Sequence, residues 1–88
     1  MNGTTARRRP TQAELDAERA KVRRLQFMMS MVMSVIAQNG RMRVEEASEL
    51  VASAREAALS MFPGKELAYD LIYRPRFQRL LSEKYRLQ

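Results

Sequence analysis

The chain has 88 residues, with 16 Lys and Arg against 10 Asp and Glu, and it contains neither His nor Cys. This length allows one domain with a small core, and stability must come from helix packing or oligomerisation because disulfides are impossible. The missing residue types exclude zinc fingers, haem ligation, iron–sulfur clusters and catalytic triads that use His or Cys. We therefore expect no metal, no cofactor and no enzymatic activity. The lack of Cys fits a reducing or an oxidising compartment, and a cytoplasmic location is expected because the sequence fits neither an export signal nor a membrane span.

The net charge of +6 is unevenly distributed along the chain. Residues 1–44 carry nine basic and three acidic side chains, residues 45–72 two basic and six acidic, and residues 73–88 five basic and one acidic. The acidic middle segment can neutralise the basic ones, within one copy or between copies. Residues 1–10 lack apolar periodicity and are predicted to form a flexible basic tail, followed by a single helical domain over 11–88.

A long first helix is predicted over about 11–38. Thr11 is a favourable N-cap, Glu14 completes a capping box, and Asn39-Gly40 predicts a left-handed cap at the other end. Apolar residues recur with heptad spacing on one face, so this seam is predicted to pack in the core or between copies. The seam consists of Leu15, Val22, Leu25, Met29, Val32 and Ile36.

An uncharged, Met-rich run occupies residues 25–37 of this helix. It is shorter than the roughly 20 apolar residues that cross a bilayer, so no membrane span is predicted. Gln26, Ser30, Ser34 and Gln38 form a polar stripe along it, which either contacts another helix, faces solvent or lines a ligand site. A helix apolar on nearly every side needs cover on nearly every side, which this short chain supplies only in part. The run is therefore a core, a dimer seam or a groove for a partner.

A second helix is predicted over about 43–62, antiparallel to the first because the connection between them is short. Its seam contains three small Ala residues, which allow the Met-rich helix to approach closely. The seam consists of Val44, Ala47, Val51, Ala54, Ala58 and Met61. Two short helices are expected to complete an all-α domain, and no strand is predicted.

The third helix is predicted over about 65–73 and is expected to bury Leu67, Leu71 and Ile72. Pro75 ends it and begins a fourth helix over about 75–87, since Pro disfavours helical geometry in the residue before it but suits a first helical turn. Asp70 lies one turn from Arg74, which predicts a weak surface ion pair. The apolar face of the fourth helix consists of Phe77, Leu80, Leu81 and the aliphatic stem of Lys84.

Two functions agree with these patterns. The first is a non-enzymatic interaction or regulatory module that acts through helix packing and forms a homodimer or higher homo-oligomer, with its basic segments contacting an acidic protein or its own acidic segment. The alternative is nucleic-acid binding, because basic side chains near aromatic ones can contact phosphates and bases. The candidate contacts to an anionic partner are Arg7, Arg8, Arg9, Arg74, Arg76, Arg79 and Arg86.

Overall fold

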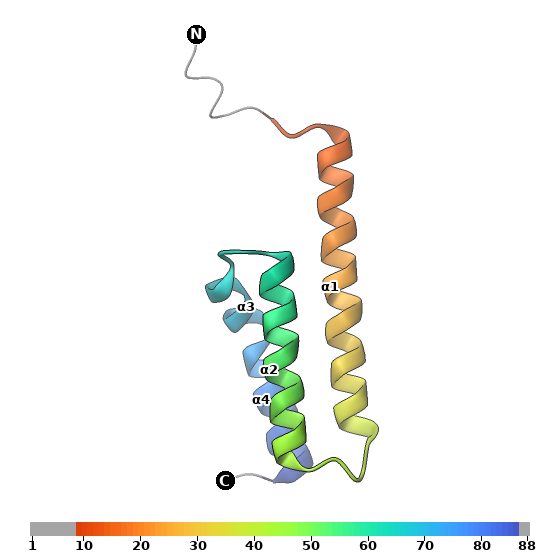
Figure 1. Ribbon diagram of the computed structural model, residues 1–88, viewed down its shortest axis with the longest axis vertical. Helices are drawn as coiled ribbons and strands as arrows, with labels where there is room; N and C mark the ends of the chain where they lie inside the picture. Colours follow the sequence, from red (N-terminus) through yellow and green to blue (C-terminus); the bar gives the residue numbers. More distant parts are fainter. Residues whose placement is uncertain (1–8, 87–88) are drawn as a thin grey trace.

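The computed structural model describes residues 9–86, and within that range it contains four helices and no strand (Figure 1). The helices are α1 (Gln12–Gln38), α2 (Val44–Met61), α3 (Glu66–Ile72) and α4 (Arg74–Tyr85). The predicted all-α architecture is confirmed, and every helix begins and ends within two residues of its predicted bounds. Of the predicted basic tail, residues 1–8 lie outside the described range.

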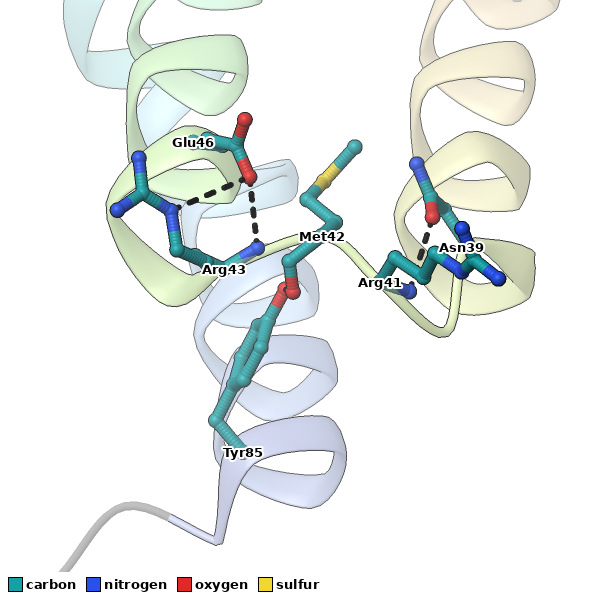
Figure 2. A network of polar contacts seen from close by, with 6 residues as sticks. All are labelled: Asn39, Arg41, Met42, Arg43, Glu46 and Tyr85. Carbon is teal, nitrogen blue, oxygen red and sulfur yellow. Dashed lines mark hydrogen bonds and ion pairs between the residues drawn. The ribbon is translucent and has the colours of Figure 1, made fainter.

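Both ends of α1 are fixed by short side chains. At its start the Oγ1 atom of Thr11 accepts a hydrogen bond from the backbone N–H of Glu14 at 3.1 Å, and the Glu14 carboxylate accepts one from the N–H of Thr11 at 2.7 Å. This is the predicted capping box. At its end Asn39 has an extended backbone (φ −88°, ψ 96°), so the predicted left-handed cap is wrong. The Asn39 side chain instead accepts a hydrogen bond from the N–H of Arg41 at 3.0 Å, which turns the chain without left-handed geometry (Figure 2).

The core lies between α2, α4 and the C-terminal part of α1. Three small residues of α2, namely Ala47, Ala54 and Ala58, are buried, which lets the two long antiparallel helices approach each other closely. Phe77 of α4 fills the space beside them and is 2% exposed. The complete set of buried residues in the described range is Met29, Ile36, Ala47, Ala54, Ala58, Tyr69, Tyr73 and Phe77.

The rotation of α3 differs from the prediction. Leu67, Leu71 and Ile72 were expected to be buried, but they are 72%, 70% and 52% exposed. Tyr69 and Tyr73 face the core in their place. The larger Tyr rings bury more surface than the Leu side chains, and the Tyr69 hydroxyl reaches the sulfur of Met29 at 3.8 Å.

An ion pair between α2 and α3 holds this rotation. The guanidinium of Arg55 donates to both carboxylate oxygens of Asp70, at 3.0 and 3.1 Å. Asp70 thus forms its close ion pair with Arg55. A two-point contact of this kind fixes both distance and orientation. Arg74, the partner predicted from the spacing, acts on Asp70 through its charge and helps to lower the pKa of Asp70.

The C-terminal end of α4 is attached to the loop between α1 and α2. The Tyr85 hydroxyl donates to the backbone oxygen of Met42 at 2.8 Å (Figure 2), and the Lys84 ammonium donates to the backbone oxygen of Asn39 at 2.8 Å. In the same loop the Glu46 carboxylate accepts a hydrogen bond from the N–H of Arg43 at 2.9 Å, at the start of α2. Contacts from α4, from the loop after α1 and from the start of α2 therefore close this end of the molecule.

The opposite end is open, because α1 extends well beyond the other three helices (Figure 1). Residues 12–19 are all exposed. Near Lys21 the helix reaches the end of α2, where the ammonium lies 4.7 Å from the centre of the Phe62 ring. We call residues 12–22, up to and including this contact, the α1 extension.

Candidate functional site

The predicted seam of α1 is divided between two environments. Met29 and Ile36 are 1% and 0% exposed, and Leu25 and Val32 pack against the same core. Leu15 and Val22, the first two residues of the seam, are each 38% exposed. One apolar face therefore begins as surface in the α1 extension and continues into the core.

An open groove of about 710 Å³ lies where the extension meets the rest of the chain. It is bordered by α1, the end of α2, α3 and the start of α4. Glu18, Lys65 and Arg76 contribute charges of both signs to its lining. Its apolar lining includes Val22, Leu25, Met33, Leu59, Phe62 and Ile72. An apolar cleft with few polar groups is the usual form of a binding site, for a small ligand or for a helix.

The polar stripe of α1 follows one side of this groove for half of its length. Gln26 and Ser30 line the groove, whereas Ser34 and Gln38 do not, and all four residues are exposed. The stripe therefore borders the groove at Gln26 and Ser30, and it faces solvent outside the groove at Ser34 and Gln38. In a helix the Ser hydroxyl can donate a hydrogen bond to a backbone carbonyl of the preceding turn. Placing Ser beside apolar residues therefore costs little stability.

Two further apolar patches face away from the core. On α1, Phe27, Met31 and Val35 are spaced one turn apart and are exposed. On α3, Leu67 and Leu71 form a second such patch. The sequence predicts that α1 is apolar on nearly every side, which agrees with the first patch, whereas the prediction that Leu67 and Leu71 lie in the core is wrong.

The candidate basic contacts that the structure describes are exposed, and two of them border different cavities. Arg7 and Arg8 lie outside the described residues, and Arg9, Arg74, Arg76, Arg79 and Arg86 are all exposed. Arg76 borders the groove, and its guanidinium lies 5.6 Å from the centre of the Tyr73 ring. Arg74 instead borders a smaller cavity of about 410 Å³ between α2, α3 and α4. The two arginines thus border different cavities.

Electrostatic effects around the smaller cavity involve the Arg55–Asp70 pair, both members of which line it. Hydrogen bonding to Arg55 lowers the pKa of Asp70 below its usual value, and the same bond raises the pKa of Arg55. Burial raises the pKa of the Tyr69 hydroxyl, which is therefore neutral at physiological pH. The groups whose pKa values are shifted, Arg55, Asp70 and Tyr69, are the ones that hold α3 in place.

The described part of the chain offers no group of three or more acidic, His or Cys side chains that could hold a metal ion. Within the same residues, no helix combines the length and the apolar character needed to cross a membrane. Comparisons with known proteins find no family model, no curated protein and no solved structure that matches the chain.

Proposed function

We propose that the protein is a non-enzymatic interaction module that acts through helix packing and assembles as a homodimer or a higher homo-oligomer. The observation that carries this proposal is the exposed apolar surface around a small core. Large apolar side chains are exposed on three separate surfaces of one copy: the seam of the α1 extension, the outer face of α1 and the outer face of α3. Apolar surface of this extent is typical of protein–protein contact sites.

The charge distribution agrees with self-association. Acidic side chains are concentrated in residues 45–72, and basic ones in the segments before and after it. Copies of such a chain can pair oppositely charged surfaces, which guides association and fixes its register. The absence of His and Cys from the sequence leaves few residue types for catalysis and favours a binding role.

Size-exclusion chromatography with light scattering tests the proposal. Between about 1 and 100 µM, mass action predicts an increase from the 10.2 kDa of one chain to at least twice that mass. A species of 10.2 kDa that persists over the whole range would overturn the proposal.

Nucleic-acid binding is the second candidate. Exposed Arg residues along α4, with Arg76 close to the Tyr73 ring, are the observation in its favour. A gel-shift titration with random duplex DNA and RNA at low salt distinguishes the two functions. Binding that weakens steeply with salt would support the second candidate, and the absence of a shift at about 10 µM protein would exclude it.

A further inference from the structure

We infer that two copies of the chain pair through their α1 extensions, antiparallel and about a two-fold axis; this inference rests on the proposed self-association. The seam that builds the core continues into the extension, where Leu15 and Val22 remain partly exposed. Beyond the end of α2 the described chain supplies no helix over Leu15, whereas Val22 lines the groove beside Phe62 and is still 38% exposed. A second α1 is a helix whose exposed seam has the same spacing and can fill this position.

The spacing of the exposed seam places the two-fold axis. Leu15 and Val22 are seven residues apart and so lie on one face of the helix. In a two-fold interface the same surface of both copies is used, and each contact occurs twice. An axis between Glu18 and Arg19 brings Leu15 of each copy level with Val22 of the partner subunit.

The charges of the extension change sign at this same point. Residues 12–18 contain three acidic and no basic side chains, whereas residues 19–24 contain four basic and no acidic ones. Antiparallel pairing puts the acidic turns of one copy beside the basic turns of its partner, whereas parallel pairing would align like charges. This order of charges is self-complementary, and it favours a second copy over an unrelated helix.

Within one copy, four of these charges form only exposed ion pairs, and Lys21 also lies over the Phe62 ring. Lys21 lies 3.9 Å from Glu18, and Arg19 lies 3.8 Å from Asp16, with all four side chains between 38% and 65% exposed. Exposed ion pairs of this kind contribute little to stability, so sharing these charges with a partner costs little. With the axis between Glu18 and Arg19, Glu18 is level with the partner's Arg19, and the partner's Lys21 lies within one helical turn of Glu18 on the same side of the seam.

The groove lies beside the proposed interface. With the axis between Glu18 and Arg19, the partner's Gln12 becomes level with Leu25 of the first copy. Leu25 lines the groove together with Phe62, at the end of α2. The partner's first helical turn therefore covers this end of the groove, and the two-fold axis repeats the contact on the other copy.

Cysteine cross-linking tests the orientation, because the wild-type chain has no Cys. The variants Leu15→Cys and Val22→Cys are oxidised separately and as an equimolar mixture, at a concentration where light scattering shows dimers. Since a disulfide needs Cα atoms within about 7 Å, we expect roughly five-fold more covalent dimer from the mixture than from either variant alone. Met31→Cys and Leu71→Cys, on the two outward apolar patches, are the matched controls and should form little covalent dimer.

Charge reversal tests the same pairing without a covalent bond. Glu18→Lys and Lys21→Glu each place like charges across the interface, so either variant alone should dimerise several-fold more weakly than the wild type. In a dimer that contains one copy of each variant, positions 18 and 21 are basic in one copy and acidic in the other, so an equimolar mixture should dimerise at least as tightly as the wild type. A mixture no tighter than its components would overturn the inference.

The remaining outcomes separate the inference from the proposed function. Dimers that cross-link through Met31→Cys or Leu71→Cys, and not through the mixture, would overturn the α1 interface but leave self-association standing. Leu15→Cys that cross-links with itself as efficiently as in the mixture would show parallel pairing and would also overturn it. A wild-type chain that stays monomeric would overturn both.

Discussion

The two halves of α1 carry the same apolar seam but differ in what covers it. In the C-terminal half, Met29 and Ile36 are buried against α2 and α4, while in the N-terminal half Leu15 and Val22 are exposed. The difference follows from length, because α2 has 18 residues against the 27 of α1, and the chain turns back into α3 once α2 has ended. Periodicity identifies which face of a helix is to be covered, and helix lengths determine whether the same chain can cover it.

The largest expected effect separates the buried core from the exposed outer face of α1. Phe77→Ala removes a ring that is 2% exposed and should lower the free energy of unfolding by about 3–5 kcal/mol, from lost burial and the cavity that remains. Phe27→Ala removes the same ring from the outer face of α1, where it is 67% exposed, and should change it by less than about 0.5 kcal/mol. Urea denaturation of dilute protein measures both values. Equal losses would contradict the assignment of these two surfaces.

Close approach of α1 and α2 is tested by enlarging a small residue. Ala47→Leu adds a side chain where no surface is exposed and should cost about 1–3 kcal/mol through overpacking. Ala52→Leu adds the same atoms at an exposed position of the same helix and is the control. Thermal unfolding compares the two, and a stabilising effect of Ala47→Leu would show that the helices are less tightly packed than described.

A smaller effect is expected where α3 is attached to α2. Asp70→Asn removes the charge that Arg55 binds and should destabilise the protein at neutral pH by less than Phe77→Ala does. Because the pKa of Asp70 is lowered in the folded state, its ionised form stabilises the fold above the ordinary Asp pKa. That contribution is lost as the pH falls through the lowered pKa, so the difference between variant and wild type should shrink in acid.

Urea midpoints measured from neutral pH to about pH 2 check this dependence. Glu56→Gln, an exposed carboxylate next to Arg55 in the sequence, is the matched control and should follow the wild type at every pH. A difference for Asp70→Asn that stays constant with pH would contradict the role given to the ion pair.

The smallest effect concerns the loop that closes the C-terminal half. Tyr85→Phe deletes the hydroxyl that donates to the Met42 oxygen and leaves the ring in place. Amide hydrogen exchange in residues 39–43 should accelerate, with little change in global stability. Tyr73→Phe, at a buried ring on the other side of the core, should leave exchange in this loop unchanged.

Most of the fold could be predicted from local signals, but the rotation of α3 could not. The capping box at Thr11 and the break at Pro75 locate helix ends because they depend on neighbouring residues alone. In the short α3, Leu67 with Leu71 and Tyr69 with Tyr73 have the same spacing and are both apolar pairs. The choice between them depends on Arg55 and Met29, which are distant in the sequence.

The candidate site was predicted only in part for a related reason. The α1 seam was identified from heptad spacing, and the structure shows where that seam leaves the core. The groove was not located in the sequence, because its walls come from four different helices and its position depends on where α2 ends. The outward-facing Leu67 and Leu71 were assigned to the core because apolar residues in a short helix are usually buried.

Hydrogen exchange along α1 at two protein concentrations tests most directly whether its open half is covered by a second copy. An isolated helical extension of about ten residues is only marginally stable, so it should exchange rapidly in a monomer. The amides of residues 25–38 should be protected at both concentrations, and those of residues 15–21, which begin with the Leu15 N–H bonded to the Thr11 oxygen, only where light scattering shows dimers. Protection of residues 15–21 that does not depend on protein concentration would contradict this account.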